Sequence, residues 1–139
     1  NKGWSLPINV SAFTRRLTKI NQINGKKVVP VIKLAKNLFS RLPQQYQLSG
    51  YHVEALAVDA FATYNGRYTL YDMTKRLLDY STKRVLTPMN DVTGQSGVID
   101  SYLGATNSLH RQHLSHYIKD IAGRFSGSDA VSVTKELFG

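Results

Sequence analysis

Two lysines, a serine and a tyrosine form the most suggestive set of chemical groups in this sequence. Lys33 and Lys36 lie about one helical turn apart in an apolar periodic stretch, and Leu48-Ser49-Gly50-Tyr51-His52 opens the next helical pattern after a short polar loop. Such a loop makes the two helices antiparallel neighbours. Lysines beside a helix N-terminus with a free hydroxyl suit a phosphate group, and a tyrosine ring can stack on a base.

The same four residues also have a purely structural interpretation. Tyr51 can pack in the core, while Lys33 and Lys36 are solvated side chains on an exposed helix face. Ser49 would then act only as the N-cap of its helix. The residue types and their spacing leave both interpretations open.

Other polar residues come less close to a recognisable site. His110, His113 and His116 are spaced by three and fan over about 120° of a helix, which predicts a solvated polar stripe rather than a metal site. Asp91 and Asp100 flank a glycine-rich stretch, where turn and capping roles suffice for both.

Gly127-Ser128-Asp129 looks like the Gly-Ser pair that opens a nucleotidyltransferase active site. That chemistry needs two or three carboxylates to hold two Mg²⁺ ions, and the only acid after Asp129 is Glu136. We therefore interpret Ser128 as the cap of a short last helix. The sequence also contains no nucleophile elbow, no phosphate-binding Gly-Lys-Ser/Thr loop and no dinucleotide fingerprint.

Positive charge is concentrated in the first part of the chain. The formal net charge is +9, yet the first acidic residue is Glu54. From that position onward basic and acidic residues are equal in number, so the excess lies before it, in Lys2, Arg15, Arg16, Lys19, Lys26, Lys27, Lys33, Lys36 and Arg41. An acid-free basic segment, residues 1–53, attracts nucleotides, nucleic acid or an acidic protein surface. Solubility alone is better served by mixed signs.

Length and composition predict one helical domain over residues 1–139. The 139 residues can sustain a core, and the lack of cysteine excludes disulfides and Cys-ligated zinc. No apolar run is long enough for a membrane span and no signal peptide is visible, so we expect a cytoplasmic protein. The sequence opens on Asn1 rather than Met, which suggests a domain of a longer chain.

The elements that must position these residues are predicted as an all-α bundle of about four to five helices. The alternation of Trp4, Leu6, Ile8 and Val10 suggests a short extended segment, and 11–23 carry a weak helical pattern ending at the turn Asn24-Gly25. Stronger helices are predicted from about 27 to 43, with Pro30 in the first turn, from 49 to 64, and from 69, where Thr69 and Asp72 resemble a capping box. A loop follows at 85–97, and then a helix over 99–125, broken near Gly104.

Two stretches carry a resemblance to a known family. Val31-Ile32-Lys33-Leu34-Ala35-Lys36-Asn37-Leu38, followed by Leu48-Ser49-Gly50-Tyr51-His52-Val53-Glu54, resembles the C-terminal helical half of the cGAS/DncV-like nucleotidyltransferases of CBASS antiphage systems and of oligoadenylate synthase. The stretch 88–100 looks like the Asp-Pro-x-Gly loop of the bacterial enzymes, with the proline displaced. Poly(A) polymerases and CCA-adding enzymes share a similar helical domain.

The resemblance implies roles for single residues. Lys36, with Lys33 as its competitor, would contact triphosphate oxygens of ATP or GTP, Ser49 would hydrogen-bond a phosphate, and Tyr51 would stack on the base. Asn37 stands where the family usually has an aromatic residue, and Gly50 where it usually has serine. The Gly-Ser loop, the carboxylates and their Mg²⁺ would belong to a catalytic lobe that is not present in this chain.

Three functions follow from these observations. The first is the nucleotide-binding helical domain of a nucleotidyltransferase that makes cyclic or linear oligonucleotide messengers, working with a catalytic lobe of the same or a partner chain. The second is a stand-alone basic helical module that binds nucleic acid. The third is a domain whose basic face docks an acidic protein.

Overall fold

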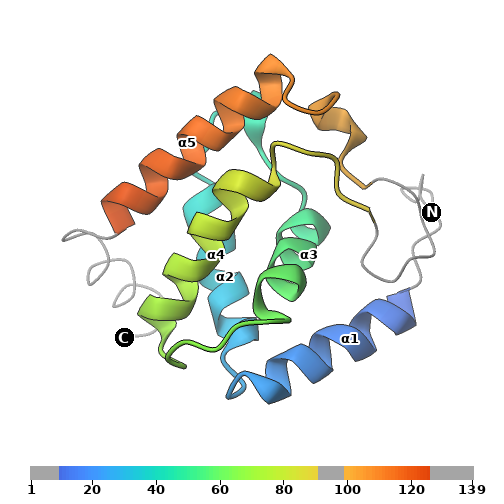
Figure 1. The fold of residues 1–139 in the computed structure, drawn as a ribbon, viewed down its shortest axis with the longest axis vertical. Coiled ribbons are helices and arrows are strands. Elements are labelled where there is room, and N and C mark those ends of the chain that lie inside the picture. Colours follow the sequence, from blue (N-terminus) through green and yellow to red (C-terminus); the bar gives the residue numbers. More distant parts are fainter. Residues whose placement is uncertain (1–9, 91–98, 126–139) are drawn as a thin grey trace.

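The computed structural model describes residues 10–90 and 99–125, and these residues form a helical bundle (Figure 1). Its α-helices are α1 (Val10–Ile23), α2 (Val28–Phe39), α3 (Gly50–Phe61), α4 (Leu70–Arg84) and α5 (Leu109–Phe125). Two short 3₁₀ turns, η1 (Gln44–Tyr46) and η2 (Ser101–Leu103), lie in the connections. Within the described residues there is no strand, which confirms the predicted all-α class.

Helix α3 is the centre of the bundle. It is buried on most of its circumference and packs against α1, α2 and α4. Helices α1 and α5 lie on opposite sides of the molecule, with α1 against α2 and α3, and α5 against α4 (Figure 1). None of the helices in the described ranges is long and apolar enough to cross a membrane.

Local signals place the starts of the middle helices. Ser49 is the N-cap of α3, and its side chain accepts a hydrogen bond from the His52 backbone N–H. Thr69 caps α4 in the same way, accepting from the Asp72 backbone N–H. Because each cap satisfies a backbone donor that has no partner within the helix, both helices begin where the sequence predicts.

The connection between α1 and α2 is the turn predicted at Asn24-Gly25. The buried Asn24 amide donates to the carbonyls of Ile20 and Phe61, which ties the end of α1 to the end of α3. Gly25 has a φ of 69° and Lys26 a φ of 60°. Two successive left-handed residues reverse the chain tightly, and Gly25 adopts this conformation without steric cost. Pro30 then lies in the first turn of α2, as expected.

Several predicted boundaries are wrong. Helix α2 ends at Phe39 rather than near Pro43, because residues 40–42 continue as tight turns with i→i+3 hydrogen bonds. Helix α3 ends at Phe61 rather than near Tyr64. The predicted helix over 99–125 is α-helical only from Leu109. Before it, η2 ends at Leu103, and the next residue, Gly104, has a φ of 91° that interrupts the helix, so the break predicted near Gly104 is confirmed. Val10, predicted as the last residue of an extended segment, is instead the first residue of α1. The rest of that segment and the helix predicted from Ser128 lie outside the described residues.

Candidate functional site

The two lysines lie on the exposed face of α2, and Lys36 reaches the beginning of α3. The ammonium of Lys36 lies 3.6 Å from the position that a Cβ on Gly50 would occupy. Gly50 is the first residue of α3, so this ammonium contacts the helix at its first turn. A Cβ at position 50 would still lie at an ordinary van der Waals distance from this ammonium, so the contact itself does not require glycine.

Lys33 and Lys36 share a surface groove between α1 and α2. Its lining residues are Leu17, Val29, Ile32, Lys33, Lys36 and Glu54. Lys36 forms an ion pair with Glu54 at 2.7 Å, whereas Lys33 has no ion pair among the described residues. An exposed pair of this kind contributes about 0–1 kcal/mol, so a stronger anion can replace the carboxylate. Among residues 10–90 and 99–125, the groove therefore presents Lys33 without an ion pair and Lys36 in a weak one, and the Lys36 ammonium lies beside the beginning of α3.

The structure gives Ser49 and Tyr51 defined structural contacts. The Ser49 hydroxyl accepts from the His52 N–H at 3.0 Å, so it is engaged as a cap. The Tyr51 ring packs edge-on against Phe13 of α1, with ring centroids 4.8 Å apart, and is half-buried against the core. Lys36 and Ser49 thus lie at the beginning of α3, Lys33 lines the groove beside Lys36, and the Tyr51 ring faces α1.

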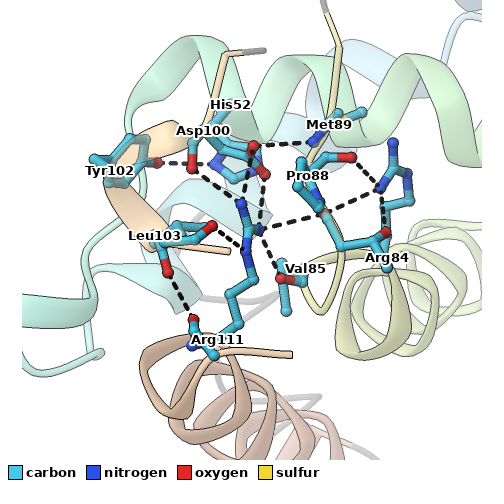
Figure 2. Close-up of polar contacts among 12 residues, drawn as sticks. His52, Arg84, Val85, Pro88, Met89, Asp100, Tyr102, Leu103 and Arg111 are labelled. Carbon is cyan, nitrogen blue, oxygen red and sulfur yellow. Dashed lines mark hydrogen bonds and ion pairs between the residues drawn. The ribbon is translucent and has the colours of Figure 1, made fainter. Parts of the chain in front are cut away.

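A tyrosine that sequence reasoning did not single out also reaches the beginning of α3. Tyr102, in η2, places its hydroxyl 2.8 Å from Nδ1 of His52, and the Ser49 backbone N–H donates to the same hydroxyl at 3.5 Å (Figure 2). Half of the Tyr102 side chain remains exposed. Its partners lie 50 or more positions away in the sequence, so no local pattern reveals this contact.

Behind Tyr102 lies a buried ion pair between Asp100 and Arg111. Both side chains are fully buried, and Nη1 of Arg111 lies 3.1 Å from Oδ2 of Asp100 (Figure 2). The other Asp100 oxygen accepts from the Met89 backbone N–H at 2.9 Å. The guanidinium also donates to the carbonyls of Val85, Thr87, Asp100, Gly104 and Ala105. A single side chain therefore joins the end of α4, η2 and the beginning of α5.

One observation in the sequence could have indicated the burial of Arg111. On α5 it lies three positions before Leu114 and seven before Ile118, which is the spacing of the buried stripe. A charged residue at such a position needs a partner in the core. In the charge balance from Glu54 onward, Arg111 is only one basic residue among several, and the glycine-rich stretch predicts a turn or capping role for Asp100. The Asp100 side chain makes no capping hydrogen bond to η2; it accepts from the Met89 backbone N–H and is the partner of Arg111.

His52 connects this buried pair to Tyr102. Its Nε2 is buried without a hydrogen bond and lies 3.7 Å from Oδ2 of Asp100. Burial lowers the pKa of His52 to about 4, with Asp100 opposing the shift and the Arg111 charge adding to it. The ring is therefore neutral at pH 7. It accepts from the Tyr102 hydroxyl through Nδ1 and turns an Nε2–H toward Asp100. Burial likewise raises the pKa of the Tyr102 hydroxyl.

The remaining candidates do not form a site in the described part of the chain. His110 and His113 both contact Tyr46, the latter through a 3.0 Å hydrogen bond between Nδ1 and the phenol, and His116 is exposed. Residues 10–90 and 99–125 contain no group of three or more side chains that could hold a metal ion. Asp91 and the Gly127-Ser128-Asp129 stretch lie outside the described residues.

Comparisons with protein-family models, with curated proteins and with solved structures gave no match to this chain. The chemistry of the groove at the beginning of α3, together with the sequence resemblance, is therefore the basis for a functional proposal.

Proposed function

We propose that this chain is the nucleotide-binding helical domain of a cytoplasmic nucleotidyltransferase that makes cyclic or linear oligonucleotide messengers, as in bacterial antiphage signalling. The observation that carries the proposal is the position of Lys36, whose ammonium lies at the first turn of α3, 3.6 Å from the Cβ position of Gly50. The resemblance of the segments around Lys36 and Ser49 to that family supports the messenger class.

The ligand at this groove would be the triphosphate of ATP or GTP. The first turn of an α-helix presents backbone N–H groups and the positive end of its dipole, and both favour phosphate oxygens. Lys36 is tethered there by Glu54 and Lys33 lines the same groove, so two ammonium groups can face one polyanion. The ligand would take the Lys36 ammonium from Glu54, and the carboxylate would turn to solvent.

Catalysis would need a second lobe, of the same or a partner chain. Transfer of a nucleotidyl group requires carboxylates that hold Mg²⁺ at the reacting phosphate. In this proposal the helical domain holds the triphosphate, and the other lobe supplies the metal ions and the reacting hydroxyl. The role of this chain is to orient its ligand.

Titration of ¹⁵N-labelled protein with ATP and GTP tests the proposal, because amide shifts detect even millimolar binding. We expect shifts at Gly50 and Tyr51, and at least a tenfold loss of affinity in Lys33→Ala/Lys36→Ala, since charge-assisted phosphate contacts contribute about 1.5–3 kcal/mol each. The matched control is Lys83→Ala/Lys119→Ala, which removes two exposed lysines elsewhere on the molecule. Equal affinity in the two double variants would exclude this groove as the phosphate site.

A second candidate function is nucleic-acid binding by the basic segment. Arg15, Arg16 and Lys19 of α1 and Lys26 and Lys27 of the following turn are exposed, and none has an ion pair among the described residues. Such binding would weaken steeply with salt, with a log–log slope near one for each phosphate contacted. Duplex DNA and RNA titrations at low salt test it, and no detectable binding there would exclude it.

A further inference from the structure

We propose that Tyr102 is the aromatic residue against which the nucleobase stacks, so that the ligand lies across the N-terminal end of α3. This inference rests on the proposed nucleotide-binding function. It assigns the base to a residue outside the segments that resemble the nucleotidyltransferase family.

Tyr102 has a more open ring than Tyr51. The Tyr51 ring packs edge-on against Phe13, with centroids 4.8 Å apart. The Tyr102 side chain is 51% exposed, although its hydroxyl contacts His52. Figure 2 shows this hydroxyl directed into the polar network and the ring on the outer side of it. A base stacks best on a ring with an open face, and here Tyr102 has the more open ring.

Tyr102 and Lys36 meet α3 at different positions of its first turn. Lys36 approaches α3 at Gly50, whereas Tyr102 approaches it at His52. Successive residues of an α-helix are rotated by about 100°. Positions 50 and 52 are therefore about 200° apart, which is about 160° measured the shorter way around the helix. An α-helix with its side chains is about 10–12 Å across. A nucleoside triphosphate carries its charge at one end and its base at the other, so it can reach both sides.

The Tyr102 ring is held in place before a ligand arrives. Tyr102 lies two positions after Asp100, whose carboxylate and carbonyl are both bound by the buried Arg111. Its hydroxyl is bound by His52 on the opposite side. A ring that is already fixed loses little conformational freedom on binding, which favours affinity. Asp100 and Arg111 are thus positioning residues for the base, and Tyr102 is the residue in contact with it.

The test compares two probes, ATP and inorganic tripolyphosphate, on the same protein by NMR titration. Tripolyphosphate carries the charge and lacks the base. We expect Tyr102→Leu to weaken ATP about tenfold, as expected for the loss of one stacked base, and to leave tripolyphosphate unchanged. Lys36→Ala should weaken both. The control is Tyr68→Leu, because Tyr68 is 47% exposed and lies at the α1–α2 turn, where its hydroxyl meets the Ile23 carbonyl.

The outcomes separate the two proposals. If ATP and tripolyphosphate both bind but Tyr102→Leu affects them equally, or affects neither, the role of Tyr102 is refuted and the phosphate site stands. If neither probe binds the unaltered protein, the proposed function fails, and the inference fails with it.

A measurement on the unaltered protein covers the case in which Tyr102→Leu does not fold. Intermolecular NOEs from adenine H2 and H8 should reach the ring protons of Tyr102. NOEs to the ring of Tyr51 instead would overturn the inference and support the stacking role that the family resemblance implies for Tyr51.

Discussion

Replacing Arg111 with methionine should strongly destabilise the fold, because Arg111 is the partner of a fully buried carboxylate. Both Arg111 and Asp100 have no exposed side-chain surface. Methionine fills a similar space but leaves Asp100 charged and unpaired in the core, and it leaves the carbonyls of Val85, Thr87 and Gly104 without this donor. Breaking a buried ion pair in this way costs about 3–5 kcal/mol.

That cost is a large part of the stability of such a domain. A domain of this size unfolds with about 5–15 kcal/mol, so Arg111→Met should lower the melting temperature by roughly 10–20 °C. Asp100→Asn should be destabilising for the complementary reason, because the guanidinium loses its counter-charge. The double variant Asp100→Asn/Arg111→Met contains no unpaired charge. It should therefore cost less than the sum of the single changes, by about 1–3 kcal/mol.

Urea unfolding followed by circular dichroism measures these free energies. The control is Arg124→Met, which removes one member of the exposed Asp120–Arg124 pair and should change stability by no more than about 1 kcal/mol. If Arg111→Met costs no more than Arg124→Met, the buried pair does not hold α4, η2 and α5 together. Additive single and double variants would show that the two side chains act independently.

Three further predictions concern His52, Glu54 and Thr69. The pKa of His52 is lowered from 6.5 to about 4 in the folded protein, so the unfolded chain binds a proton first as the pH falls. The free energy of unfolding should therefore drop between pH 6.5 and 4, by up to about 3 kcal/mol. In that window His52→Gln should flatten the dependence of the urea midpoint on pH. An unchanged slope in that variant would mean that His52 is not the group responsible. Glu54→Gln removes the carboxylate that competes for Lys36, so ATP affinity should rise about two- to fivefold by NMR titration, and the gain should vanish in a Lys36→Ala background; a fall in affinity would contradict the assigned competition. Thr69→Ala removes the cap of α4 and should cost about 1 kcal/mol in urea unfolding, with Thr63→Ala, exposed and outside any helix, as the neutral control.

The sequence was sufficient to predict features that depend on neighbouring residues. Ser49 and Thr69 each bond a backbone N–H three positions ahead, so their capping roles are encoded within one turn of chain. The Asn24-Gly25 turn and the apolar stripe of α2 follow from backbone preference and helical periodicity in the same way. The helix ends were predicted less well, because the last turns at Phe39 and Phe61 are not marked by a glycine or proline in the next position.

The contacts around the candidate site depended on the tertiary structure. Lys36 reaches Gly50 and Glu54 only because α2 packs beside α3, and the Tyr51 ring turns toward Phe13 because α1 covers that side of the helix. The predicted phosphate, base and Mg²⁺ roles remain predictions that binding measurements must test.

By itself, then, the sequence determined an all-α fold, the caps of its middle helices and an acid-free basic segment, because each of these follows from residues close together in the chain. Only the tertiary structure decided that Tyr102 meets His52 across 50 positions and that Asp100 and Arg111 form a buried pair. The physical reason is that a charged side chain removed from water is stable only when it is paired with another group. Packing of the helices supplies that group from a distant part of the sequence, which no local pattern indicates.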